Sequence, residues 1–309
     1  MKGVFYSVMT LMLLLPIVSY LVLYSDVIKS QNEELAQRIT GEKLASFSKS
    51  IDIDLKKALN IYARRSIGNA VAHIETNGTP IDNSNVRLKE LFTNNTIYGS
   101  SAALNSSIYE WRDKIISRGS QLGFDTTINF SNVYFAPYDS FNVILNVSVE
   151  VNITAGDTTV YRNYNESVIV SIEDYEDPLY TLNTNGLVKN IIKKSSFSVT
   201  NVTHLDNLTS RKLYISSSDG ASFFDRLEGS LIASSTYKAM SSNTIGLESI
   251  VYQPDLLAFG ITPKTGQSYV DYLYFDSDAN TGYPVNNSAI SWLRIDNTHA
   301  GLYGVQLNT

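Results

Sequence analysis

The chain has 309 residues, and its 24 lysines and arginines against 30 aspartates and glutamates give a net charge of −6. Because a nucleic-acid-binding face needs clustered basic residues, this balance argues against nucleic acid as a partner. Cysteine is absent, which excludes disulfides, thiolate metal sites and cysteine nucleophiles. The apolar content of 43% is sufficient for a packed core, and the length suits one large or two modest domains.

The N-terminal residues 4–24 form an uncharged stretch of 21 residues, close to the roughly 20 that a membrane-spanning helix needs. Lys2 precedes this stretch and Asp26 follows it, so the positive-inside rule predicts a cytoplasmic N-terminus. A cleavable signal peptide is the alternative. Its apolar core usually has about 7–15 residues and ends in a small-residue cleavage site, which this stretch lacks. We therefore predict a retained transmembrane anchor at residues 1–25, with the lipid bilayer as its partner.

Ten Asn-x-Ser/Thr sequons follow the predicted anchor, about twice the number expected by chance from the composition. Such asparagines are modified only on the non-cytoplasmic side of a membrane. The sequons therefore indicate a cell-membrane protein with an extracytoplasmic, glycosylated C-terminal part. The predicted acceptors are Asn77, Asn94, Asn105, Asn129, Asn146, Asn152, Asn165, Asn201, Asn207 and Asn286.

Residues 26–75 have the pattern of a long amphipathic helix that continues out of the anchor. Thr40 and Gly41 are expected to interrupt this helix, and the Asn-Gly-Thr-Pro sequence at 77–80 is expected to end it. Two more helices are predicted at 84–94 and 107–122. The apolar residues at three- and four-residue spacing, which define one face of the long helix, are Leu44, Phe47, Ile51, Leu55, Leu59 and Tyr62.

The clearest strand lies at residues 141–153, where seven apolar residues alternate with mainly polar ones. Runs at 124–135 and 158–172, joined to it by a Pro-containing turn and an Ala-Gly-Asp turn, predict an antiparallel meander. Asn146, Asn152 and Asn165 fall on the polar faces of these strands, as acceptor asparagines should.

The predicted fold class is α+β, with the N-terminal helix packed on the apolar face of the meander. This arrangement resembles the plan of type IV pilin-like proteins and would occupy residues 26–178. Residues 179–309 are richer in Ser, Thr, Asn and Gly. We expect them to form a distal β-rich module with strands at 212–216, 269–275 and 290–295 and one helix at 221–228.

Few residues have the spacing of a chemical site. Asp276, Asp278 and Asn280 place oxygen side chains as calcium loops do, although a polar hairpin loop explains the run as well. Asp296 and His299 are close enough to meet, and we interpret them as a capped turn rather than a catalytic pair. The acidic run at 173–177 is interpreted as solvated acids at a strand end. The chain has no Gly-x-Ser-x-Gly or His-Glu-x-x-His motif and no phosphate-binding glycine loop. We therefore predict neither an enzyme nor a bound cofactor.

The sequence at 171–187, SIEDYEDPLYTLNTNGL, is similar to that of a group of archaeal envelope proteins with an EDPLY-x-LNT-x-G centre. The same group has a Met-Lys/Arg-Gly start before an apolar anchor, which also resembles a prepilin peptidase site. Cleavage after Gly3 would make Val4 the mature N-terminus. Three further motifs of this group of envelope proteins, FxxRLEG, VDY[IL][YF]F and W-x-[KR]-x-D-x-x-H, correspond here to residues 223–229, 270–275 and 292–299. The resemblance implies an archaeal surface location and no enzymatic activity.

Two functions are consistent with these observations. The first is a membrane-anchored archaeal cell-surface glycoprotein with a structural role, associated with pilus, secretion-system or other envelope proteins. The second is an anchored extracellular module that binds a glycan, a protein or calcium through residues 181–309.

Overall fold

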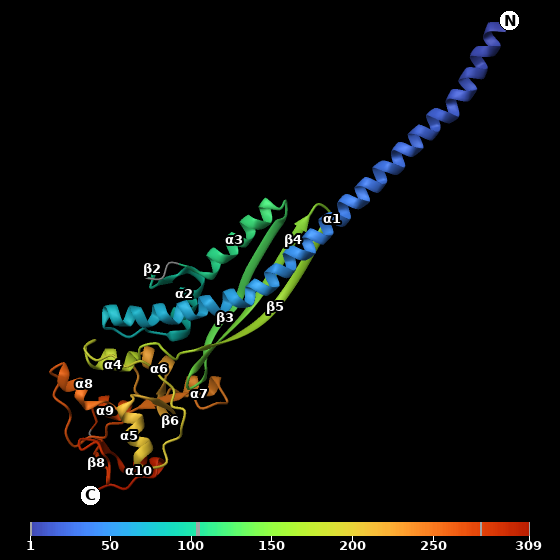
Figure 1. The fold of residues 1–309 in the computed structure, drawn as a ribbon. Coiled ribbons are helices and arrows are strands. Elements are labelled where there is room, and N and C mark those ends of the chain that lie inside the picture. Colours follow the sequence, from blue (N-terminus) through green and yellow to red (C-terminus); the bar gives the residue numbers. More distant parts are fainter. Residues whose placement is uncertain (1, 103–105, 279, 309) are drawn as a thin grey trace. The chain divides into compact units, whose positions relative to one another are not determined.

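The computed structural model describes residues 2–102, 106–278 and 280–308 (Figure 1). The architecture is α+β, with a long N-terminal helix and antiparallel sheets, as predicted. The chain forms two compact units. The first comprises Met1–Ile53, Ile115–Ile128 and Val151–Arg162, and the second comprises Asp54–Lys114, Asn129–Glu150 and Asn163–Thr309.

In chain order the elements are α1 (Lys2–Asn77), α2 (Ser84–Asn94), β1 (Thr96–Ile97), β2 (Ser100–Ser101), α3 (Ile108–Gln121), β3 (Asp125–Asp139), β4 (Asn142–Ala155), β5 (Thr158–Ser171), α4 (Pro178–Asn183), α5 (Val202–Ser210), β6 (Tyr214–Ser222), α6 (Phe223–Leu227), α7 (Ser235–Met240), β7 (Gly246–Ser249), α8 (Gln253–Ala258), α9 (Asp271–Phe275), β8 (Tyr283–Pro284), β9 (Arg294–Ile295) and α10 (Asn297–Tyr303).

Helix α1 is a single helix of 76 residues. The predicted interruption at Thr40 and Gly41 is wrong, because the helix runs through both residues. The Thr40 hydroxyl donates a hydrogen bond to the carbonyl of Ala36 at 2.9 Å, one turn earlier. A glycine inside a helix costs only about 1 kcal/mol, which the helix-forming residues on either side outweigh.

The two ends of α1 differ in what surrounds their apolar side chains. All six residues of the predicted apolar face, from Leu44 to Tyr62, are buried, which confirms the helical spacing. From Met9 to Ile28, by contrast, the apolar side chains whose burial the structure describes are exposed. Within the described residues, α1 is the only helix long and apolar enough to cross a membrane.

The main sheet has the strand order β3-β4-β5, and its strands are joined by two-residue connections (Figure 1). Connections this short make neighbouring strands antiparallel. In the second connection Gly156 has φ +57°, a conformation that hairpin turns need and that glycine adopts without strain. Along β4 every second residue from Val143 to Ile153 is buried, so the predicted alternation is confirmed.

Each unit brings helix and strand side chains together. In the first unit the Phe47 and Phe124 rings lie 5.6 Å apart, and Gly119 of α3 lies against Thr126 of β3. A Cβ atom at position 119 would lie 2.3 Å from Thr126 Oγ1, so only glycine allows this approach. In the second unit Lys56 of α1 lies 3.7 Å from Glu166 of β5.

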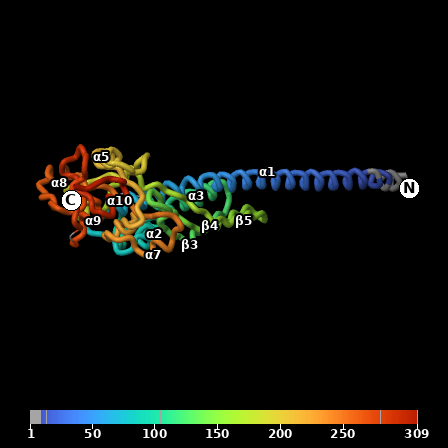
Figure 2. The backbone as a smooth tube through the Cα atoms, turned by 90° about the horizontal axis from the view of Figure 1, so that it is seen from below, coloured from blue at the N-terminus to red at the C-terminus, as the bar shows by residue number. Residues whose placement is uncertain are grey.

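The chain after residue 178 differs from the predicted β-rich module. Its described residues contain seven short helices and four short strands, which Figure 2 draws in colours from yellow-green to red. The helix expected at 221–228 is present as α6, and β6 overlaps the strand expected at 212–216. Of the strand expected at 290–295, only Arg294–Ile295 is formed.

The strand predicted at 269–275 is wrong, because residues 271–275 form α9. Only Val270 pairs, with Ile250, before the chain turns into the helix. The Asp271 carboxylate accepts a hydrogen bond from the Tyr272 backbone N–H at 2.7 Å. The periodicity of a short apolar run does not distinguish a strand from a helix. Here the hydrogen bond between the Asp271 carboxylate and the Tyr272 N–H lies in the first turn of the helix.

Candidate functional site

A fully buried arginine organises the interior of the second unit. Arg226 of α6 lies between two equally buried carboxylates, with Nη1 at 2.5 Å from Asp177 Oδ2 and at 3.0 Å from Asp271 Oδ2. Its other nitrogens donate to the carbonyl groups of Ala221 and Leu247. Burial opposes the charge of Arg226, but the two carboxylates outweigh it and raise the pKa of the guanidinium group.

Polar neighbours donate further hydrogen bonds to the two carboxylates. The Tyr214 hydroxyl donates to Asp177 Oδ2 at 2.9 Å, while Asp177 Oδ1 caps α4 by accepting from the Leu179 N–H. Ser249 donates to Asp271 Oδ2 from its N–H and its hydroxyl, at 3.0 and 2.7 Å. Burial raises the pKa of Asp271 to about 6, although Arg226 acts in the opposite direction.

A second buried network forms around His299 of α10. Asp296 caps α10 by accepting from the His299 N–H at 3.0 Å, and its carboxylate also lies 2.8 Å from His299 Nδ1. On the other side of the ring, Nε2 lies 3.1 Å from the Tyr272 hydroxyl and 3.6 Å from Glu248 Oε2. The capped turn and the Asp296–His299 contact both follow the prediction.

The charges of this second network stabilise one another. Burial alone would lower the pKa of His299, but its contacts with Asp296 and Glu248 raise that pKa to about 9. Burial would raise the pKa of Asp296, and the hydrogen bonds from His299 instead lower it to about 2. At neutral pH His299 is therefore protonated, and it holds two carboxylates in place.

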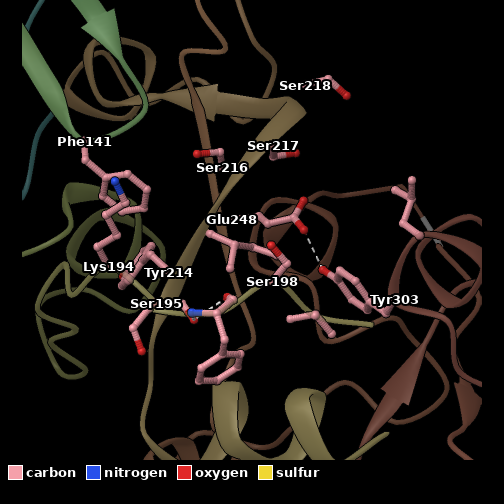
Figure 3. A pocket seen from close by; sticks show the side chains of 15 residues that line it. Phe141, Lys194, Ser195, Ser198, Tyr214, Ser216, Ser217, Ser218, Glu248 and Tyr303 are labelled. Carbon is pink, nitrogen blue, oxygen red and sulfur yellow. Dashed lines mark hydrogen bonds between the residues drawn. The ribbon is translucent and has the colours of Figure 1, made fainter. Parts of the chain in front are cut away.

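An open cavity of about 440 Å³ lies beside these networks (Figure 3). Glu248 and Tyr303 line it, and the Tyr303 hydroxyl donates to Glu248 Oε1 at 2.6 Å. The remaining lining residues come from Phe141, from residues 194–199, from residues 214–218 of β6 and from Leu302 of α10.

Local structure explains how these segments meet. β6 and β7 pair so that Ile215 lies opposite Glu248, which brings the carboxylate to the serine-rich part of β6. Helix α10 ends at Gly304, whose φ is +62°. A Cβ atom there would lie 2.6 Å from the carbonyl oxygen of Thr200, so glycine lets the end of α10 reach the chain that follows residues 194–199.

The predicted acceptor asparagines differ in exposure. Seven are exposed: Asn77, Asn94, Asn129, Asn152, Asn165, Asn201 and Asn207. Asn146 and Asn286 are half-buried, and Asn105 lies outside the described residues. Asn201 caps α5 through its side-chain oxygen, which leaves the amide nitrogen to carry a sugar.

Two of the sequons are linked across β4 and β5. Ser167 donates to Asn146 Oδ1 at 2.6 Å, and Ser148 donates to Asn165 Oδ1 at 2.8 Å. Ser148 and Ser167 are the hydroxyl residues of the Asn146 and Asn165 sequons respectively. Each sequon therefore donates its hydroxyl to the acceptor asparagine of the other.

The predicted calcium loop gains no support from its geometry. Asp276 Oδ1 accepts from the Asp278 N–H at 3.2 Å, and Asn280 Nδ2 lies 3.4 Å from the Asp278 carbonyl. The ammonium group of Lys264 donates to the carbonyl groups of Tyr274 and Asp276, so a positive charge already lies at the start of the loop. Across the described part of the chain, no group of three or more His, Asp or Glu side chains could hold a metal ion.

Sequence reasoning identified the Asp296–His299 pair but missed the arginine network. It interpreted the acids at 173–177 as solvated, whereas Asp177 is completely buried. The missed residues do belong to the motifs at 171–187, 223–229 and 270–275. The structure brings Asp177, Arg226 and Asp271 of these motifs together.

Comparison with protein-family models, with curated proteins and with solved structures gives no match for this chain. The likeness to archaeal envelope proteins therefore remains a prediction from sequence motifs. The processing residues Gly3 and Val4 lie in the first turn of α1.

Proposed function

We propose that this protein is a membrane-anchored archaeal cell-surface glycoprotein with a structural, non-enzymatic role. Its N-terminus is cytoplasmic, and its folded units lie outside the cell. Its partners are the lipid bilayer and pilus, secretion-system or other envelope proteins.

The observation that carries this proposal is the division of α1. Its first part presents apolar side chains, among them Leu14, Leu15, Ile17 and Leu21, of which half or more of the surface is exposed. Soluble monomers rarely expose so large a contiguous apolar surface. The later part of the same helix, from Leu44, belongs to the core. Lipid tails would cover the apolar side chains of the first part, whose backbone groups are already paired within the helix, and the second part would stay unchanged.

The distribution of sequons supports the proposed orientation. All ten lie after the apolar stretch, and seven of the nine described ones are exposed, so a glycosylation enzyme outside the membrane could modify this part of the chain. Lys2 on the other side of the stretch agrees with a cytoplasmic N-terminus.

Membrane extraction of the native cells tests the anchor. We expect the protein to stay in the membrane fraction after washing with alkaline carbonate and to be degraded when intact cells are treated with protease. Leu14→Arg together with Ile17→Arg should release it, because an arginine near the centre of a bilayer costs about 2.5–3.5 kcal/mol. The matched control is Leu35→Arg, at an exposed leucine beyond the apolar stretch, which should leave retention unchanged. Extraction of the unaltered protein by carbonate would contradict the proposal.

Intact mass spectrometry of the membrane-extracted protein tests the remaining parts. A mature N-terminus at Val4, with recovery of the protein in filaments, supports association with pili. An intact Met1 in a membrane fraction free of filaments contradicts the processed-pilin version. The same mass counts the occupied sequons, and a mass without any glycan contradicts the glycoprotein assignment.

A further inference from the structure

The cavity of Figure 3 is rich in hydroxyl groups that the protein does not use. Ser196, Ser198, Ser216 and Ser218 line it and are exposed. Within residues 2–102, 106–278 and 280–308, none of these four side chains makes a hydrogen bond. Each hydroxyl both donates and accepts, so together they match a ligand that also carries many hydroxyl groups.

Apolar surface accompanies the hydroxyl groups. Phe197 is half-buried, and Leu302 is 62% exposed at a place where α10 reaches the cavity. A pyranose ring has an apolar face of C–H groups and a rim of hydroxyl groups. A cavity with a few apolar side chains and several oriented polar groups is suited to such a ligand.

The charges that line the cavity balance. Lys194 contributes one positive charge, and its ammonium group lies 5.1 Å from the centre of the Phe141 ring. Glu248 contributes one negative charge, and its carboxylate is held by Tyr303 and His299. Because the lining has no net charge, the ligand that fits it best is neutral.

The buried networks give the cavity a rigid wall. Glu248 and Tyr303 are almost completely buried, at 3% and 2% exposure, and both belong to the hydrogen-bonded cluster around His299. A wall that is already ordered loses little conformational freedom when a ligand binds. The cavity of about 440 Å³ falls within the usual range for small-ligand sites.

We propose that this cavity is a binding site for a neutral saccharide, in which the four free serines bind the sugar hydroxyls and Phe197 and Leu302 contact the apolar face of the ring. This assignment goes beyond the structural role proposed above and does not depend on it. The proposal of a membrane anchor and that of a saccharide site can be contradicted separately, because the first is tested in cells and the second on purified protein.

Ligand-observed saturation-transfer NMR and titration calorimetry test this site on the full chain, purified in detergent from a host without Asn-linked glycosylation. The neutral probes are methyl α-glucoside, methyl α-mannoside, methyl α-galactoside and N-acetylglucosamine. Glucuronate and glucose 6-phosphate are the charged comparisons. We expect at least one neutral probe to bind with a Kd of about 1 mM and more tightly than either charged probe.

Serine variants locate the binding. The quadruple variant Ser196→Ala, Ser198→Ala, Ser216→Ala and Ser218→Ala should raise that Kd at least tenfold. Its matched control changes three exposed serines whose side chains make no hydrogen bond in the described part of the chain, Ser210→Ala, Ser242→Ala and Ser291→Ala, and should leave the Kd unchanged. Equal melting temperatures of the variants show that both are folded.

Three outcomes would overturn the assignment. None of the neutral probes binds; or a neutral probe binds the quadruple variant as tightly as the unaltered protein; or glucuronate or glucose 6-phosphate binds more tightly than every neutral probe.

Discussion

The three-stranded sheet and the chain that follows it are stabilised in different ways. The inner face of β4 is a row of apolar side chains from Val143 to Ile153, each at most 3% exposed. After β5 the interior instead contains charged groups, among them Asp177, Arg226 and Asp271, which are completely buried. The sheet is therefore stabilised mainly by removal of apolar surface from water, and the later chain needs specific polar partners as well.

This difference follows from the length of the elements. A strand of 14 residues and a helix of 76 residues bury long apolar faces by repeating one local conformation. Elements of five to nine residues, such as α6 and β6, leave many backbone groups at their ends without a partner. Arg226 supplies partners for backbone groups of two short strands, because it donates to the carbonyl groups of Ala221 in β6 and Leu247 in β7.

The largest effect should come from Arg226→Met, which leaves two buried carboxylates without their shared cation. We expect a loss of about 3–5 kcal/mol in the free energy of unfolding, measured by chemical denaturation of the full chain in detergent. Arg211→Met is the matched control, because Arg211 is exposed and its side chain has no partner among the described residues. It should change stability by less than about 0.5 kcal/mol. A similar small effect of Arg226→Met would show that the buried charges do not stabilise this region.

The next largest effect should come from Leu145→Ala on the inner face of β4. Leu145 is completely buried, so the change removes apolar contacts and leaves a cavity, at a cost of about 3–4 kcal/mol. Ile169→Ala changes a residue of β5 that is 46% exposed and should cost less than about 1 kcal/mol. Denaturation of Leu145→Ala at low and high salt tests this apolar origin. The cost of Leu145→Ala should not depend on salt, and a strong dependence would contradict an apolar origin.

The same difference explains which parts of the fold could be predicted from the sequence. The alternation along β4 and the three- and four-residue spacing from Leu44 to Tyr62 are local patterns, and both were predicted residue by residue. The contacts of Arg226 with Asp177 and Asp271 join residues 49 and 45 positions apart. No periodicity marks such contacts, so the acidic run at 173–177 was interpreted as solvated.

The candidate site was predictable only where its residues are close in the chain. Asp296 and His299 are three residues apart at a helix start, a spacing that brings a capping carboxylate to its partner. Glu248, Ser216 and Lys194 come from three separate segments, and their meeting depends on the pairing of β6 with β7 and on the end of α10. The motif residues Asp177, Arg226 and Asp271 were visible in the sequence, but their common location was not.

The pKa of His299 makes the stability of the later chain depend on pH. Its folded pKa of about 9 lies above the ordinary value of 6.5, so its contribution to stability is fully present below about pH 6.5. The contribution is lost as the pH rises through 9, and its full size is up to about 3 kcal/mol. His299→Gln should therefore lower stability at pH 6 more than at pH 9.5. His204→Gln, at a half-buried histidine of α5 outside this network, is the matched control. A pH dependence that survives His299→Gln would contradict this assignment.

The smallest effect concerns the polar outer face of the sheet. The two sequons that are hydrogen-bonded across β4 and β5 test how much such a side-chain contact contributes there. Asn146→Gln and Ser148→Ala both remove the Asn146 sequon, but only Ser148→Ala also removes the hydroxyl that donates to Asn165. One such hydrogen bond contributes about 0.5–1.5 kcal/mol. Its loss should free the Asn165 side chain and raise glycan occupancy there in Ser148→Ala relative to Asn146→Gln. Glycopeptide mass spectrometry of both variants from the native host measures this ratio, with Asn207 as the internal reference. Equal occupancy would mean that the cross-strand hydrogen bonds form only after the glycans are attached. The polar groups of this face, unlike the charged groups around Arg226, would then have no fixed partners when glycosylation takes place.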